Sequence, residues 1–352
     1  MPTETMTARE RWLAVLQHRR PDRAPLDYWA TPEVDRSLMA HLGQSSKVEM
    51  LRALHVDFVV DIVPRYVGPA LPPGRDVWGI GYRDMPYAGG VYAEAAYRPL
   101  AQYETLDEIR HNHTWPEPDW WDWSEVAQQV RGFEDHPIAG GGSQPFMIYK
   151  DLRGHERALM DLRECPDIAH YCIDQISEVF YQGTVRAFEA LPGQITLTYV
   201  DEDLGGQRNL MISPAQIREF LFPGMRRMIE LGHGAGAYIR HHDDGAISRI
   251  LPELVELGID FLNPLQWRAE GMDRAWLKRE FGSRIALHGG MDNQYTLPFG
   301  TVAEVRQEVR DNLRILGDGG GYILAPCHNL QPITPIDNIL ALYATAYDEG
   351  WY

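Results

Sequence analysis

Two histidines and two aspartates follow one another at residues 241–244, directly after the run AYIR. Side chains two positions apart in a strand point to the same side, so His242 and Asp244 can share one cation. His328, which follows the run YILAP, is a third candidate ligand, and Cys327 beside it is a possible fourth. These ligands suit Zn²⁺ in an open catalytic site, although nickel, iron or manganese accept the same donors. In a metal-free alternative, both histidines are neutral, hydrogen-bonded residues that line a pocket.

Carboxylates and other polar residues follow the remaining apolar runs. ITLTYV ends at three adjacent acids, of which alternation sends Asp201 and Asp203 to one side. Adjacent carboxylates raise at least one pKa among them unless a cation compensates, so a general acid or a metal ligand is chemically reasonable. The alternative is a solvated loop whose acids cap the next helix. The candidate catalytic residues are Asp61, Tyr149, Asp203 and His328. The candidate substrate-binding residues are Tyr28, Asp201, Glu202, Asn263, His288, Asp292 and Asn329.

These side chains meet only if separate apolar runs end at the same edge of the fold. Strands are predicted near residues 25–30, 57–63, 137–141, 195–200, 237–242, 259–263, 285–289 and 322–326. Helix starts are marked by Ser or Thr with Glu, Gln or Asp three residues later, at Thr7, Ser46, Thr105, Ser213, Thr301 and Thr334. Eight strands alternating with helices predict an α/β fold, a single (β/α)8 TIM-type barrel over residues 1–352. An open doubly wound sheet would show the same alternation.

The segment from about residue 77 to 123 interrupts this alternation. It is rich in aromatic residues and glycine, and Gly89-Gly90 separates two alternating runs, which predicts a hairpin inserted after the second strand. The hairpin is either a surface decoration or a lid or interface, because long insertions in compact domains are often functional.

Composition limits the classes of partner. The chain has 50 acidic and 33 basic residues and a net charge of -17, which disfavours nucleic acid and anionic membranes. No apolar run approaches the roughly 20 residues of a membrane helix, and the first residues lack the apolar core of a signal peptide. We therefore expect a cytoplasmic protein. Three cysteines indicate no disulfide framework.

Several long segments resemble the uroporphyrinogen decarboxylase superfamily. They are TARERWLAVLQHRRPDRAPL, DEDLGGQRNLMISPAQIREFLFPGMRRMIELGHGAGAYIRHHDDGAI, GIDFLNPLQW, IALHGGMDNQ and GGYILAPCHNLQPITPIDNILALYATA. Within the superfamily they look more like the branch of corrinoid-dependent methyltransferases than the heme-pathway decarboxylase. The resemblance implies a single β/α barrel with its active cleft at the carboxyl ends of the strands, and makes a homodimer plausible.

The chain departs from both branches at particular residues. The methyltransferases hold zinc with an H-x-C pair and a later cysteine, positions that correspond here to His242, Asp244 and His328, so both thiolates are replaced. Asp61 and His328 resemble the decarboxylase's substrate aspartate and strand-end histidine. Its arginine-bearing segment after the first strand is replaced by PLDYWATPEV, so a polycarboxylate substrate loses its main charge partners.

These features predict a metal-assisted methyltransferase. It would move a methyl group between a small methoxy, methylthio or methylamino substrate, or a thiol, and a cobalamin carried by a separate corrinoid protein, with Zn²⁺ as the Lewis acid. The first alternative is a metal-free decarboxylase that acts on a small organic acid. The second is a catalytically inactive corrinoid- or tetrapyrrole-binding protein.

Overall fold

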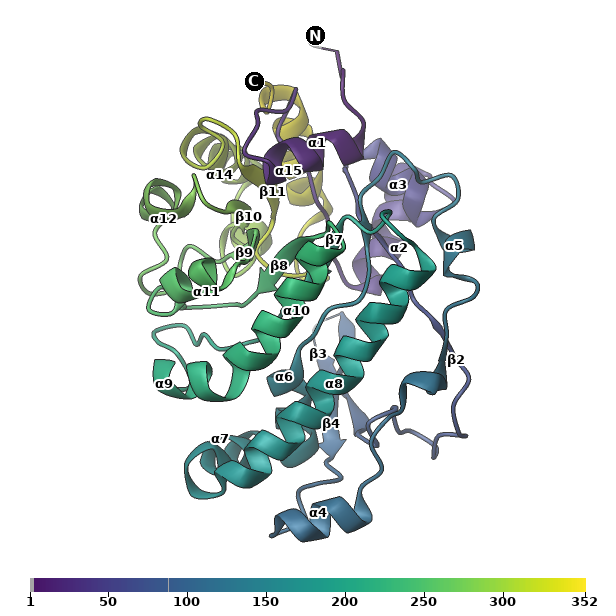
Figure 1. Cartoon of the computed structure of the whole chain (residues 1–352). Coiled ribbons are helices and arrows are strands. Elements are labelled where there is room, and N and C mark those ends of the chain that lie inside the picture. Colours follow the sequence, from purple (N-terminus) through teal and green to yellow (C-terminus); the bar gives the residue numbers. More distant parts are fainter. Residues whose placement is uncertain (1–2, 88) are drawn as a thin grey trace.

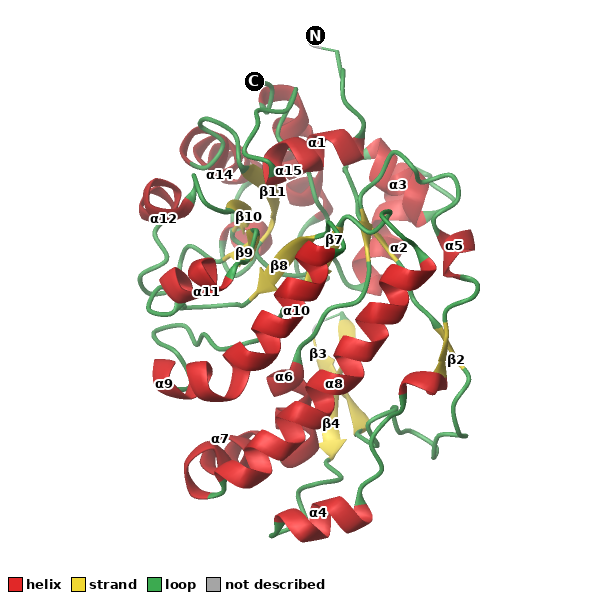
Figure 2. Ribbon diagram, viewed as in Figure 1, coloured by secondary structure: helices red, strands yellow, loops and turns green. Residues whose placement is uncertain are grey.

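The computed structural model describes residues 3–87 and 89–352, and its largest sheet has seven parallel strands. In spatial order these strands are β1 (Val60–Asp61), β6 (Ile138–Ala139), β7 (Leu197–Tyr199), β8 (Tyr238–His242), β9 (Phe261–Leu265), β10 (Ala286–Met291) and β11 (Tyr322–Pro326). The sheet curls, and helices surround it (Figure 2). Seven of the predicted strand regions therefore contain a strand of one parallel sheet.

Residues 25–30, predicted as the first strand, do not form a regular strand. They make isolated parallel bridges instead, Leu26 with Leu324 and Ala30 with Leu330. Leu324 N donates to Pro25 O at 2.9 Å, and Asp57 N donates to Leu26 O at 2.7 Å. The segment thus lies between β11 and the residues that lead into β1. Pro25 has no N–H to offer a ladder, which is one reason why the pairing is interrupted.

Helices occupy most of the chain between the strands (Figure 1). They are α1 (Ala8–Leu16), α2 (Pro32–Leu42), α3 (Lys47–Ala53), α4 (Leu106–Asn112), α5 (Val126–Gln129), α6 (Pro145–Arg153), α7 (His155–Glu164), α8 (Pro166–Ala190), α9 (Pro214–Gln216), α10 (Phe222–Gly234), α11 (Leu251–Leu257), α12 (Arg274–Phe281), α13 (Thr296–Phe299), α14 (Val302–Ile315) and α15 (Ile336–Glu349), with a 3₁₀ turn η1 (Pro118–Trp120) and a π-helical turn η2 (Ile217–Leu221). Reciprocal capping boxes form at the starts marked by Thr7, Thr105, Ser213 and Thr301. The start predicted at Thr334 is wrong, because Pro335 is the N-cap of α15 and makes no side-chain cap bond.

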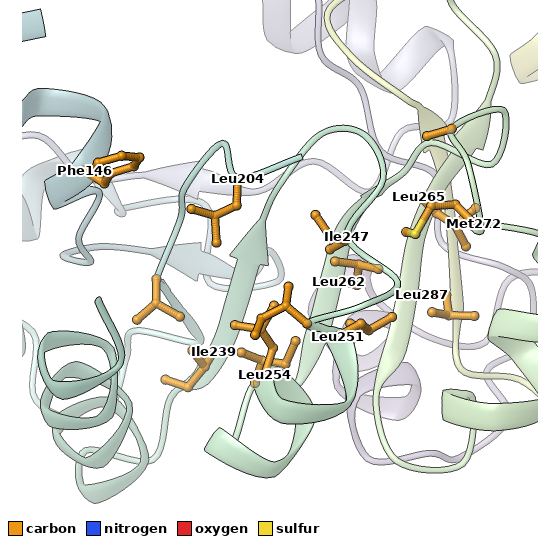
Figure 3. Close-up of a cluster of buried hydrophobic side chains, with 14 of the residues drawn as sticks. Phe146, Leu204, Ile239, Ile247, Leu251, Leu254, Leu262, Leu265, Met272 and Leu287 are labelled. Carbon is orange, nitrogen blue, oxygen red and sulfur yellow. The ribbon is translucent and has the colours of Figure 1, made fainter. Parts of the chain in front are cut away.

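The outward faces of the strands pack against the helices. Ile239 of β8, Leu262 of β9 and Leu287 of β10 are fully buried and lie in one cluster with Leu251 and Leu254 of α11 (Figure 3). Each apolar side chain buried in this way stabilises the fold by roughly 1.5–3 kcal/mol. The packing fixes the strands, so the polar residues at their carboxyl ends project from a rigid frame.

A smaller apolar cluster fills the inside of the curled sheet. Trp12 of α1 packs there against Leu197, Phe261 and Ile323, which come from three different strands. Trp12 is 1% exposed, and its Nε1 donates to Asp57 O at 2.7 Å. Helix α1 lies near both chain termini at one end of the molecule, and the hairpin lies toward the other (Figure 1). Trp12 therefore closes the interior at the amino ends of the strands.

An ion-pair network ties α1 to this closed end. Asp57 accepts from Arg11 Nη1 at 2.5 Å, from Arg23 Nη1 at 2.7 Å and from Leu26 N at 2.9 Å. Arg11 also donates to Asp22 through Nε at 2.7 Å. The side chains of Arg11, Arg23 and Asp57 are 1%, 2% and 4% exposed. Every charge in the network has a partner, which is the condition under which buried charges are tolerated.

Residues 77–123 contain an antiparallel hairpin of β3 (Gly81–Tyr87) and β4 (Gly90–Tyr97), which is a sheet of its own. The segment continues through α4 to β5 (Trp121–Asp122), which pairs with β2 (Arg65–Tyr66). Of the predicted Gly89-Gly90 turn, Gly89 has a φ of 88° and Gly90 begins β4, while Ala88 lies outside the described residues. A groove of about 600 Å³ separates the hairpin from Trp29 and Asn329. Among the described residues, no helix is both long and apolar enough to cross a membrane.

Candidate metal centre

Residues 240–243, at the end of β8 and just beyond it, alternate between two sides. Arg240 and His242 line an inner cavity, whereas His241 and Asp243 are 0% exposed on the other side. Asp243 Oδ1 accepts from the N–H groups of Leu204 and Gly205 at 3.0 and 2.9 Å. The period of two thus separates two residues that hold the neighbouring loop from two that face the barrel interior and its mouth.

Asp203, His242 and Asp244 form a compact group of possible metal ligands. One ligand atom from each of the three lies within 4.8 Å of the others, and His242 Nε2 is 3.9 Å from Asp203 Oδ1. His328 borders this group, because its Nε2 lies 3.6 Å from Asp244 Oδ2. The sequence pointed to His242, Asp244 and His328 as ligands. The structure brings these three to one rim but places Asp203 in the tightest triad.

The carboxylates of this group have bonding capacity to spare. Asp203 Oδ1 and Asp244 Oδ1 are buried and have no hydrogen-bond partner within the described chain. Burial raises the pKa of Asp244 and the Asp203 charge adds to the effect, while His242 and His328 oppose it. Zn²⁺ with bonds of about 2.0–2.1 Å would draw tetrahedral ligand atoms to about 3.3 Å from one another. The observed separations, 3.9 Å between His242 Nε2 and Asp203 Oδ1 and up to 4.8 Å within the group, are longer than this value. The donor set of one imidazole and two carboxylates nevertheless fits a divalent cation, with a small inward movement of the side chains.

A hydrogen-bonded chain runs from this group into the barrel. His242 Nδ1 lies 2.6 Å from Asn263 Oδ1, and Asn263 Nδ2 lies 2.7 Å from His288 Nδ1. His288 Nε2 in turn lies 2.8 Å from Asp27 Oδ2. Residues from β8, β9, β10 and the 25–30 segment are thus linked through their side chains. Asn263 and His288, expected as substrate-binding residues, hold the His242 ring in place, Asn263 directly and His288 through Asn263.

Trp29 lies over both histidines at the rim. Its ring centroid is 4.5 Å from that of His328 and 5.8 Å from that of His242, and Trp29 is 44% exposed. His328 Nδ1 bonds to Asn329 Oδ1. Trp29 lines both the inner cavity and the groove beneath the hairpin. It therefore separates the two spaces.

The inner cavity has a volume of about 550 Å³ and mixes aromatic with charged residues. Its lining includes Trp12, Tyr28, Trp29, Phe58, Asp61, Gln144, Tyr199, Asp201, Arg240, His242, Phe261, Asn263 and His288. Arg240 Nη2 donates to Asp201 at 2.5 Å, and Asp201 Oδ1 accepts from His242 N at 2.8 Å. Asp201 therefore holds the backbone of a metal-ligand candidate while it neutralises Arg240.

Asp61 has a different environment in the same cavity. Its side chain is accessible from the cavity, and within the described part of the chain it has no hydrogen bond or ion pair. The surrounding protein desolvates the carboxyl and raises its pKa, Arg240 opposes this, and Asp27 reinforces it. This environment suits a proton carrier or a contact for a ligand's N–H or cationic group.

Two residues predicted for the site, Tyr149 and Glu202, point away from the cavity. Tyr149 is buried and donates to Asp161 Oδ2 at 2.6 Å. Glu202 is 0% exposed and accepts from the N–H groups of Phe146 and Met147 at 2.7 and 3.0 Å, so it caps α6; burial raises its pKa to about 8. Tyr149 points away from the cavity because it packs within helix α6. Glu202 does so because alternation after β7 turns its side chain to the outer side.

Asp292 and Cys327 are likewise engaged with their own surroundings. Asp292 Oδ2 accepts from Arg268 Nε at 2.6 Å and from Thr296 N at 3.0 Å at the start of α13. Cys327 is 2% exposed and its Sγ donates to Leu265 O at 3.1 Å. Burial raises the pKa of the Cys327 thiol well above its usual value, and Cys327 is not part of the ligand group formed by Asp203, His242 and Asp244 within the described chain. The suggested ligand role of Cys327 is therefore not supported.

Tyr28 does line the cavity, with its hydroxyl bonded to Asp35 Oδ1 at 2.7 Å.

Sequence reasoning did not select Asp27, Trp29 and Arg240 as site residues. Asp27 and Trp29 belong to the run LDYWA after Pro25, beside the predicted Tyr28, and alternation brings Asp27 and Trp29 to the same side. Arg240 lies two residues before His242 and faces the same cavity. The period of two, counted back from His242, would have found Arg240. It would not have found Asp27 and Trp29, because Tyr28 between them lines the same cavity.

The arrangement defines an α/β protein of the barrel type with its polar residues at the carboxyl ends of parallel strands. The uroporphyrinogen decarboxylase (URO-D) family model matches residues 98–348, and the chain belongs to this family. A solved methyltransferase from Methanosarcina mazei superposes with a TM-score of 0.66 over 97% of this chain and 99% of that chain at 19% identity, which supports the fold.

Curated relatives fall into two groups. The methylcobamide:CoM methyltransferase MtaA of Methanosarcina barkeri is 26% identical over 61% of this chain. The uroporphyrinogen decarboxylase of Thermus thermophilus is 27% identical over 57% of this chain and 52% of the relative. The chain spans 59% of the length of the matched M. barkeri methyltransferase. The predicted family resemblance, including its methyltransferase-like branch, is confirmed.

Proposed function

We propose that this protein is a metal-assisted methyltransferase. It would move a methyl group between a small methoxy, methylthio or methylamino compound, or a thiol, and a corrinoid held by a separate protein. The observation that carries the proposal is the group of Asp203, His242 and Asp244, with two unpartnered buried oxygens, at the rim of a cavity of about 550 Å³. The similarity to a methylcobamide-using methyltransferase supports the choice of reaction.

The residues divide into three tasks under this proposal. Asp203, His242 and Asp244 would hold Zn²⁺, with His328 as a further ligand or a proton carrier. The bound ion would supply Lewis acidity to the heteroatom of the methylated group. Asp61 would exchange a proton with the substrate inside the cavity, since no protein cation within the described residues pairs with it directly. Trp29 would cover the reacting group at the mouth.

The surroundings of the rim suit a reaction shared by a small molecule and a protein. The inner cavity has room for a small substrate, and the rim opens beside the hairpin of β3 and β4. We infer that residues 25–30 complete an eight-position barrel, that residues 77–123 are an insertion beside its mouth, and that the whole chain acts as one domain. A corrinoid protein would approach at this mouth.

Metal analysis combined with a transfer assay tests the proposal. Purified wild-type protein loaded with ZnCl₂ is expected to retain about one zinc per chain and to demethylate methylcobalamin in the presence of a thiol. His242→Ala is expected to lose both the metal and the activity. His41→Ala, which removes an exposed histidine at the end of α2, is the matched control and is expected to keep both. Wild-type protein that binds no metal stoichiometrically and ignores chelators would rule the function out.

A metal-free decarboxylase is the second candidate, and one observation favours it. Asp61 lies in the cavity without a direct counter-charge, as a carboxylate that stabilises a developing cation would. The decarboxylase relatives agree with this reading. Release of CO₂ from small organic acids by chelator-treated protein, lost in Asp61→Asn and retained in His242→Ala, would establish it. Binding of a corrinoid or tetrapyrrole without turnover would instead indicate an inactive binding protein.

A further inference from the structure

We propose that Asp27, His288 and Asn263 form a positioning chain that selects the ring tautomer of His242 and leaves its Nε2 lone pair free for a cation. The inference rests on the proposed metal site and assigns roles to residues that are not themselves proposed ligands. It follows from three consecutive hydrogen bonds that start at a carboxylate and end at an imidazole.

The first step is fixed by the carboxylate. An ionised Asp27 has only acceptor atoms, so the His288 nitrogen 2.8 Å from it, Nε2, carries the hydrogen. His288 is 3% exposed, and the ring centroids of Trp12 and Phe261 lie 6.0 and 6.3 Å from the centroid of its imidazole. In the neutral ring the other nitrogen, Nδ1, is then an acceptor.

The second step is made by the amide. Asn263 offers one NH₂ and one carbonyl oxygen. Because His288 Nδ1 accepts, the NH₂ faces it at 2.7 Å, and the oxygen is directed to His242 Nδ1 at 2.6 Å. His242 therefore carries its hydrogen on Nδ1. Its Nε2 has a free lone pair, which faces Asp203 Oδ1 at 3.9 Å.

The opposite tautomer would work against metal binding. A hydrogen on His242 Nε2 would point at the Asp203 carboxylate and occupy the space in which a cation must sit. Outer residues of this kind commonly change metal affinity by about 10–100-fold. Asp27 reaches His242 only through two other side chains, so it is a positioning residue and not a ligand.

Zinc affinity and histidine NMR test the chain separately. Competition between the protein and a chelating dye for ZnCl₂ is expected to show about 10–100-fold weaker binding in Asp27→Ala than in wild type. The matched control is Asp61→Ala, which removes the same charge from the same cavity outside the chain and is expected to change affinity far less. In metal-free wild type, ¹H–¹⁵N correlations are expected to show the Nδ1–H form of His242, with Asp27→Ala populating the Nε2–H form.

The outcomes distinguish this inference from the proposed function. If wild type binds zinc through His242 while Asp27→Ala matches wild type, or if Asp61→Ala weakens binding equally, the positioning chain is wrong and the metal site stands. If wild type binds no zinc, the function fails, and the metal-free spectra still decide the tautomer. A doubly protonated His288 or an Nε2–H form of His242 in wild type would overturn the chain.

Discussion

The two ends of the barrel treat buried charge in opposite ways. At the amino ends of the strands, Asp57 is surrounded by two arginines and a backbone N–H, and its side chain is 4% exposed. At the carboxyl ends, Asp203 and Asp244 face one another, and each has a buried oxygen with no hydrogen-bond partner among the residues that the structure describes. Satisfied charges hold the closed end together, whereas unsatisfied ones leave the open end ready for a ligand.

The largest effect is expected at the closed end. Asp57→Ala leaves Arg11 and Arg23 buried without their shared carboxylate, so the free energy of unfolding should fall by about 3–5 kcal/mol. Urea unfolding followed by tryptophan fluorescence measures this change. Asp107→Ala on α4, whose side chain is 82% exposed, serves as control and should stay within about 0.5 kcal/mol of wild type. A loss below about 1 kcal/mol in Asp57→Ala would remove the contrast between the two ends.

A smaller effect is expected when the closed end is acidified. Burial raises the pKa of Asp22, but Arg11 and the N–H groups of Thr5 and Arg23 outweigh it and lower the pKa from 3.8 to about 2. The resulting stability is present above pH 3.8 and is lost as the pH falls through about 2. The free energy of unfolding of the wild type should exceed that of Asp22→Asn by about 2 kcal/mol at pH 5. This difference should shrink between pH 4 and pH 2. A pH-independent difference would contradict the pairing.

The smallest effect, with the opposite sign, is expected at the open end. Asp244→Asn removes a buried charge that faces Asp203 and that His242 and His328 offset only in part, so the free energy of unfolding of the metal-free protein should rise by about 0.5–1 kcal/mol. The same substitution should abolish the stabilisation of the protein by ZnCl₂. Unfolding in urea with and without zinc measures both changes. If Asp244→Asn destabilised the metal-free protein as Asp57→Ala does, the Asp244 carboxylate would stabilise the fold, and the contrast between the two ends would be wrong.

The sequence predicted most of the parallel sheet because its strands are short apolar runs, and helix starts at Ser213 and Thr301 separate some of them. β11 occurs at the predicted residues, and β8 differs by one residue. The 25–30 segment was harder to predict, because Pro25 and Pro32 border it and its pairing reduces to bridges with Leu324 and Leu330. Local pattern does not show which neighbours will supply hydrogen bonds.

The site was predictable up to the direction of each side chain. Alternation placed Asp201 and Asp203 on one side and left Glu202 on the other, where it caps α6. The chain from Asp27 to Asn263 was not visible, since it joins residues from three separate segments and depends on distances below 3 Å. Tyr149 failed as a candidate because it lies within helix α6, where its hydroxyl found a buried partner in Asp161.

The plug formed by Trp12 makes the inner chamber blind-ended. Trp12 is 1% exposed and its indole N–H is hydrogen-bonded to Asp57 O, so a reactant cannot pass through the amino side of the sheet. Under the proposed function, a small reactant and a protein-bound one would then both approach from the side of Trp29. We expect the small molecule to load first and the large one to follow, so that a tightly held large reactant would trap the small one inside.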